Sequence, residues 1–246
     1  MKRLYDKSKI WFALAWIIAY VVLASMGDQW SAELGIGKSV TLPILLALSV
    51  GLYLFVRRNG LTEAYGLCRP RLPADRMLYY APLLSLLTVN LWYGVGRNGT
   101  PLETVLYILS MLCVGFLEEL IFRGLLFRAM AENGVRSAVI VSSVTFGMGH
   151  LVNLINGSGA ELLSNLLQVL YAVAIGFAFV MIYCRTKSLM PCILTHGILN
   201  SLSAFANEAA MTPRREILSG VFLAVVAGGY ALYLAFAVRE ADTSEL

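Results

Sequence analysis

Apolar runs without charged residues recur along almost the whole chain, and several are long enough to form helices that cross a membrane. Hydrophobic residues make up 59% of the 246 residues and charged residues only 14%, which is far from the composition of an ordinary soluble domain. We therefore expect an all-α fold, a polytopic transmembrane helix bundle in which the lipid bilayer is the main solvent.

The apolar runs define about eight predicted spans. They cover residues 10–26, 42–56, 77–93, 102–127, 137–152, 165–184, 189–205 and 217–238. The first run is longer than the apolar core of a signal peptide, about 7–15 residues, so we expect a retained helix. Because the spans leave little chain for a soluble domain, we expect one membrane-embedded domain over residues 1–246.

The basic residues predict the orientation of the bundle. With the N-terminus inside, 14 of the 19 Lys and Arg residues fall in cytoplasmic segments, four fall in outer loops, and Arg123 lies within a span. This imbalance favours cytoplasmic placement of both termini. The net charge of +4 therefore reports topology, and we expect no nucleic-acid partner. Short loops suggest a multi-pass protein of a bacterial cytoplasmic membrane.

Three charged residues interrupt the span at 102–127. Glu118, Glu119 and Arg123 follow the uncharged run 105–117, and each costs roughly 2.5–3.5 kcal/mol to insert near the middle of a membrane helix. Glu119 and Arg123 have the i, i+4 spacing of an ion pair, which leaves Glu118 as the unpaired carboxylate. Burial makes such a carboxylate a stronger base. The alternative is a neutralised packing cluster.

The two histidines of the chain both lie in predicted spans. His150 follows Phe146 by four residues, and His196 precedes Asn200 by four, so each pair shares one helix face. Glycines at 147 and 149 permit close approach of a neighbouring helix. A lone membrane histidine is often a packing residue, but two histidines and an acidic motif on three helices favour a functional site.

The polar residues form three patterns in order along the chain: Glu118-Glu119…Arg123, Phe146…His150 and His196…Asn200. Together they resemble the three motifs of the CAAX-processing and bacteriocin-processing (CPBP, or Abi) intramembrane proteases. This is the family of type II CAAX prenyl proteases. Those motifs are EExxxR, FxxxH and HxxxN/D. The resemblance covers a core of about residues 103–205.

The resemblance implies an intramembrane endopeptidase, a membrane-embedded glutamic-type hydrolase. Glu118 with His150 would bind and deprotonate a water molecule, and His196 with Asn200 would stabilise the tetrahedral oxyanion. The expected substrate is a membrane-associated or lipidated peptide or protein, whose identity and prenylation stay open, as does the oligomeric state. The residues expected to support the site are Glu119, Arg123 and Phe146.

Three other functions compete with this hypothesis. A zinc-dependent protease would use Glu118, His150 and His196 as ligands, but the chain has no HExxH pair, and we expect no cofactor. A cysteine protease would use Cys192, one turn before His196. A non-catalytic membrane regulator or scaffold, or a small transporter, would keep the polar cluster without hydrolysis.

Overall fold

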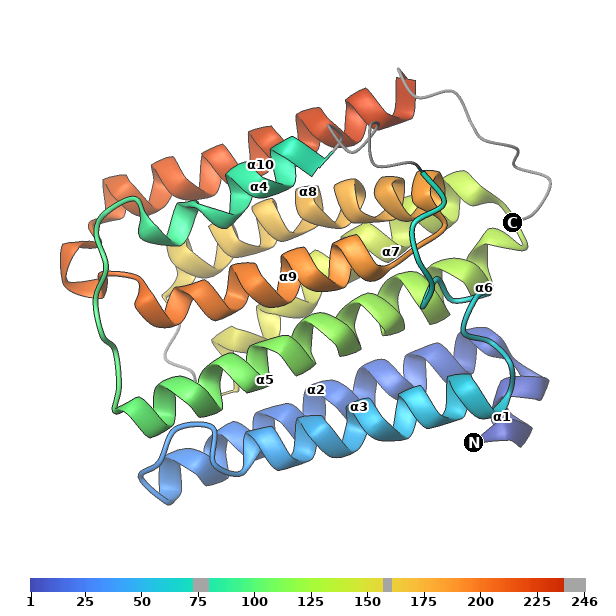
Figure 1. Cartoon of the computed structure of the whole chain (residues 1–246), viewed down its shortest axis with the longest axis horizontal. Helices are drawn as coiled ribbons and strands as arrows, with labels where there is room; N and C mark the ends of the chain where they lie inside the picture. Colours follow the sequence, from blue (N-terminus) through green and yellow to red (C-terminus); the bar gives the residue numbers. More distant parts are fainter. Residues whose placement is uncertain (73–79, 157–160, 237–246) are drawn as a thin grey trace.

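A computed structural model of the chain describes residues 1–72, 80–156 and 161–236, and these residues form a bundle of helices with no β-strand among them (Figure 1). The predicted all-α polytopic bundle is confirmed. The α-helices are α1 (Lys2–Lys7), α2 (Lys9–Glu33), α3 (Thr41–Arg58), α4 (Ala81–Leu87), α5 (Pro101–Glu119), α6 (Arg128–Ala131), α7 (Val135–Gly149), α8 (Leu162–Thr186), α9 (Met190–Leu202) and α10 (Pro213–Phe236). Shorter or wider helical turns are η2 (Val89–Leu91), η3 (Leu120–Phe127), η4 (His150–Leu154), η5 (Ser203–Phe205) and η6 (Glu208–Ala210).

The long helices run roughly side by side (Figure 1). The pair α2 and α3 packs along one flank of the bundle, α10 lies along the opposite flank, and α5, α7, α8 and α9 lie between them (Figure 1). Helix α5 packs against both α3 and α9, while α8 packs against both α7 and α10. The helix carrying the acidic motif is therefore covered on both sides.

Within the part of the chain that the structure describes, six helices are long and apolar enough to cross a membrane. In two of the predicted spans, the described residues form shorter helices. Within 77–93, α4 and η2 give only a short apolar helix, Ala81–Leu91, and within 189–205 the α-helix has 13 residues. Polar residues lie where each of these helices changes to a 3₁₀ turn. At the end of α4 they are Thr88 and Asn90. The count of eight crossings stays a prediction.

The positions of the N-terminus and of the end of α10 are relevant to the predicted placement of both termini on one side of the membrane. The N-terminus and the last described turn of α10 lie at the same end of the bundle (Figure 1). This arrangement accords with both termini on one side, and which side faces the cytoplasm stays a prediction. The tail from Arg239, the end of the predicted eighth span and the start of the third span lie outside the described residues.

Local sequence signals define where α5 begins. Thr100 caps the helix by accepting from the backbone N–H of Glu103, and the Glu103 carboxylate accepts in return from the backbone N–H of Thr100. This capping box satisfies two of the donors that every helix start leaves open, and Pro101 supplies a helical φ at the first position. Glu103 also accepts from the backbone N–H of Gly37, which ties the α2–α3 connection to α5.

Glycines set the closest helix approaches around the motif. A Cβ on Gly115 of α5 would lie 2.6 Å from the backbone nitrogen of Gly197 on α9. A Cβ on Gly147 of α7 would lie 2.8 Å from the backbone nitrogen of Val173 on α8. A Cβ on Gly149 would meet nothing within 4 Å, so only one of the two glycines before His150 permits close packing.

Replacing Gly115 by alanine is expected to destabilise the bundle by about 1–3 kcal/mol, because its Cβ would collide with α9 backbone that cannot rotate away. Gly51→Ala in α3 is the matched control, since a Cβ there meets nothing within 4 Å and alanine favours the helix by about 1 kcal/mol. The free energy of unfolding of both variants is measured in mixed detergent micelles. Equal stabilities would show that α5 and α9 are not in close contact.

Candidate active site

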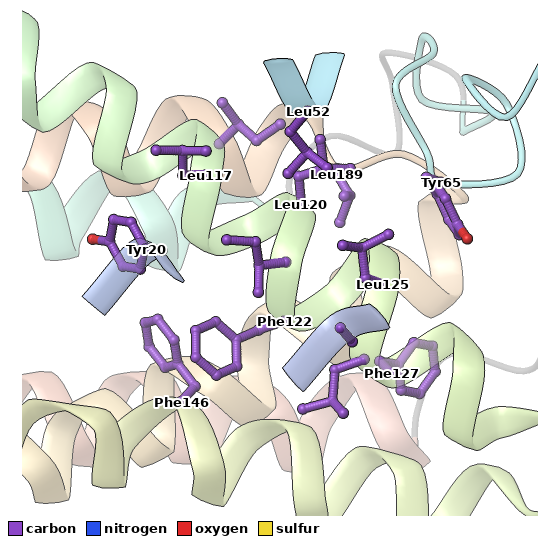
Figure 2. Close-up of a cluster of buried hydrophobic side chains, with 14 of the residues drawn as sticks. Tyr20, Leu52, Tyr65, Leu117, Leu120, Phe122, Leu125, Phe127, Phe146 and Leu189 are labelled. Carbon is purple, nitrogen blue, oxygen red and sulfur yellow. The ribbon is translucent and has the colours of Figure 1, made fainter. Parts of the chain in front are cut away.

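The acidic motif lies where helix α5 changes its hydrogen-bonding pattern. Glu119 is the last residue of α5, and η3 continues from it as a π-helical stretch of 8 residues, all of them buried. Apart from Arg123, η3 is apolar at every position, and a helix that is apolar all round belongs inside a bundle. Figure 2 shows four residues of this stretch in the main apolar cluster: Leu120, Phe122, Leu125 and Phe127. π-Helical turns inside α-helices occur often at functional sites.

The predicted ion pair between Glu119 and Arg123 is present. Arg123 Nη1 lies 3.2 Å from Glu119 Oε1, and both side chains are 0% exposed. The guanidinium carbon lies 4.1 Å from the centre of the Phe146 ring, and Phe179 is a second aromatic neighbour at 5.8 Å. Cation–π contact and the carboxylate together compensate part of the cost of burying the arginine charge.

His196 lies between the two glutamates. Its Nδ1 is 2.8 Å from Glu119 Oε1, and its Nε2 is 3.6 Å from Glu118 Oε2. A carboxylate at one ring nitrogen fixes the orientation of an imidazole and leaves the other nitrogen for chemistry. Glu119 therefore holds His196 so that Nε2 faces Glu118. The sequence analysis did not predict the contact between Glu119 and His196.

Glu118 faces a cavity and not the arginine. Its side chain is 13% exposed, and Oε1 accepts a hydrogen bond from the Tyr20 hydroxyl at 2.6 Å. Oε2 is buried and has no hydrogen-bond partner among the described residues. The expectation that Glu118 lies apart from the ion pair agrees with this arrangement, but the contact with Tyr20 was not predicted.

Two adjoining cavities bring the four candidate catalytic residues together. The first has a volume of about 230 Å³ and is lined by Glu118, His150 and Asn200 among others. The second, of about 290 Å³, is lined by His150, His196 and Asn200 among others. The two cavities share five lining residues, so we treat them as one site cavity. The shared residues are Met111, Phe146, His150, Gln168 and Asn200.

Phe146 and Asn165 hold His150 at the edge of this cavity. The His150 and Phe146 rings meet edge-on with centres 5.5 Å apart, and Phe146 also lies 5.7 Å from the His196 ring. Asn165, which is buried on α8, donates through Nδ2 to the backbone oxygen of His150 at 2.8 Å. The turn from α7 into η4 is thereby tied to α8.

Side-chain amides line the cavity near His150. Asn156 donates to Asn153 at 3.3 Å, and Asn153 donates to Gln168 at 3.1 Å. Amides both donate and accept, so they suit a pocket that binds a peptide backbone. The sequence analysis missed these residues. The Asn- and Gly-rich segment after His150 could have indicated Asn153 and Asn156 as site residues. No spacing along the chain indicates Tyr20.

The zinc alternative requires Glu118, His150 and His196 to converge on one ion. Across residues 1–72, 80–156 and 161–236, no three His, Cys, Asp or Glu side chains are grouped so that they could hold a metal. Glu119 engages only Nδ1 of His196, and this contact leaves Nε2 available to a metal. A chelator experiment decides whether activity needs a metal.

Cys192 lies apart from the cavity lining. It is fully buried on α9, and its thiol donates to the backbone oxygen of Phe179 at 3.5 Å. Buried structural cysteines are poor nucleophiles, since the thiolate is the reactive form. The position gives no support to a cysteine mechanism.

Comparison with known proteins points to one family. Residues 100–202 match the family described as type II CAAX prenyl endopeptidase Rce1-like. A curated protein of Bacillus subtilis (strain 168), named "Putative membrane peptidase YdiL", is 28% identical over 149 residues, which cover 53% of this chain. The match spans 56% of that relative, so the chain matches only about half of its length. No solved structure matches.

All seven residues singled out by the motifs lie within 100–202, whereas Tyr20 lies outside that segment.

Proposed function

We propose that the chain is a member of the CPBP/CAAX protease family and acts as an intramembrane endopeptidase that hydrolyses a peptide bond with a water molecule activated by Glu118. The observation that carries the proposal is the site cavity, because side chains from α5, η4 and α9 border it together. The proposed substrate is a membrane-associated or lipidated peptide, since the cavity lies among membrane-spanning helices.

Each side chain has a task in this proposal. The Glu118 carboxylate takes a proton from the water, and His150 holds that water against the same cavity wall. The hydroxide attacks the carbonyl carbon, and the amide side chain of Asn200 donates to the oxyanion that forms. His196, held by Glu119, presents Nε2 to the same space and donates there when protonated. Glu118 then passes its proton to the leaving amine.

The general base and the oxyanion donor are each expected to accelerate hydrolysis by orders of magnitude. A positioned general base typically accelerates a reaction by about 10²–10⁴-fold. An oxyanion donor in a site sheltered from water adds roughly 10²–10³-fold. Asn200 suits this task because its amide is neutral and keeps its donors at any working pH.

Cleavage of a membrane-peptide library by purified protein in lipid vesicles tests the proposal. We expect cleavage within or beside the spanning segment, which persists with a zinc chelator and in Cys192→Ala, and which falls about 10²–10³-fold in kcat in Asn200→Ala. Products are identified by mass spectrometry. Activity that a chelator abolishes and zinc restores would establish the metal alternative. Absence of cleavage by a folded wild type, against the library and co-expressed host membrane proteins alike, would favour a regulator or scaffold.

A further inference from the structure

The contact between Tyr20 and Glu118 joins the N-terminal part of the chain to the active site. Tyr20 lies on α2, outside the segment that matches the family, and is 98 residues away from Glu118 along the chain. Its hydroxyl donates to Glu118 Oε1 at 2.6 Å. Bonds of this length from a hydroxyl to a carboxylate oxygen belong to the short, charge-assisted class, which is about twice as strong as a neutral hydrogen bond.

The same contact distinguishes the two oxygens of the carboxylate. Oε1 is occupied by Tyr20, while Oε2 lies 3.6 Å from His196 Nε2 and is without a hydrogen-bond partner in the described part of the chain. A carboxyl group held at one oxygen keeps a single orientation, so Oε2 keeps a fixed place beside His196 Nε2.

Tyr20 is itself held firmly. The residue is 8% exposed and belongs to the same apolar cluster as Phe122 and Phe146, and the three rings lie near one another in Figure 2. Helix α2 packs directly against η3, the stretch that follows the motif. Towards the other end of α2, Asp28 accepts from both Lys38 Nζ at 2.7 Å and the Thr41 hydroxyl at 2.6 Å, which ties α2 to the start of α3.

We propose that Tyr20 is a positioning residue for the active site, which orients the Glu118 carboxylate through its hydroxyl so that Oε2 stays beside His196 Nε2. The proposal makes α2 part of the enzyme's working site, although the family segment begins 80 residues later. It rests on the proposed function for its effect on cleavage, but the orientation of Glu118 can be measured without turnover.

The experiment compares Tyr20→Phe with Tyr65→Phe. Phenylalanine keeps the ring and removes only the hydroxyl. Tyr65 is the matched control, because it is also buried in the main apolar cluster and its hydroxyl also donates to one side chain, the Tyr5 hydroxyl at 2.7 Å, away from the cavity lining. Thermal midpoints of the two variants in detergent check that both fold equally well.

The first readout is kinetic and uses the library peptide that the wild type cleaves fastest. We expect Tyr20→Phe to lower kcat by about 10- to 100-fold with KM unchanged, the size expected for a hydrogen bond to a charged group. Tyr65→Phe should leave kcat within about twofold of wild type. A Tyr20→Phe variant with the kcat of Tyr65→Phe would overturn the proposal, and so would a loss confined to KM.

The second readout is the rate at which dicyclohexylcarbodiimide, an apolar reagent for protonated carboxyl groups, labels Glu118, followed by mass spectrometry of the fragmented peptide. Loss of the donor that stabilises the carboxylate should speed labelling about 10-fold or more in Tyr20→Phe and not in Tyr65→Phe. Unchanged labelling in Tyr20→Phe would overturn the positioning role. Faster labelling in a protein that cleaves no peptide would support that role while contradicting the proposed function.

Discussion

Glu118→Gln is expected to lower the rate of peptide cleavage by about 10²–10⁴-fold, since the glutamine amide cannot take a proton from water. The substitution keeps the size and shape of the side chain, and its carbonyl oxygen can still accept from the Tyr20 hydroxyl. The expected loss is therefore chemical and not a failure to fold. Initial rates on the peptide that the wild type cleaves fastest, in vesicles at saturating substrate, measure it.

Glu33→Gln is the matched control for this variant. Glu33 ends the same helix that carries Tyr20 and is exposed. Among the described residues, it accepts one long hydrogen bond, from Gln29 at 3.3 Å. We expect its cleavage rate to equal that of the wild type. If Glu118→Gln cleaved as fast as Glu33→Gln, with both equally folded, catalysis at this cavity would be refuted and the regulator alternative would take its place.

Arg123→Met is expected to destabilise the bundle by about 3–5 kcal/mol. Methionine fills a similar length of space, so the loss comes from the charge. Glu119 would stay fully buried with His196 as its remaining partner, and a buried carboxylate without an opposite charge is costly. Titration with a denaturing detergent in mixed micelles, followed by circular dichroism, gives the free energy of unfolding.

The double variant Arg123→Met, Glu119→Gln tests the cause of that loss. It removes both charges, so most of the stability should return, since replacing a whole buried ion pair is often nearly neutral. Arg214→Met, at an exposed arginine, should change the free energy of unfolding by less than about 0.5 kcal/mol. A double variant no more stable than Arg123→Met would show that charge balance is not what the pair provides.

The helical class of the fold could be predicted from local pattern alone. Uncharged runs, proline at helix starts and the Thr100–Glu103 capping box act within a few residues, so the chain carries these signals in order. The shorter forms of α4 and α9 were harder to predict, because hydropathy averages over the polar residues that turn a helix into a 3₁₀ end.

The Glu119–Arg123 pair was also predictable, because residues four apart on one helix are neighbours in any tertiary arrangement. The spacing of Phe146 and His150, and of His196 and Asn200, placed each pair on one face for the same reason. These relations depend on helix geometry only, which the sequence determines locally.

Contacts between helices depend on how the helices pack. His196 meets Glu119 across 77 residues of chain and Tyr20 meets Glu118 across 98, and no spacing rule relates such residues. Their registers follow from close packing, such as Gly115 against Gly197, where a shift of one residue would turn each side chain by about 100°. The sequence by itself determined the helical class, the buried ion pair and the motif residues. Only the tertiary structure decided which side chains share the cavity, because that depends on the packing of distant helices.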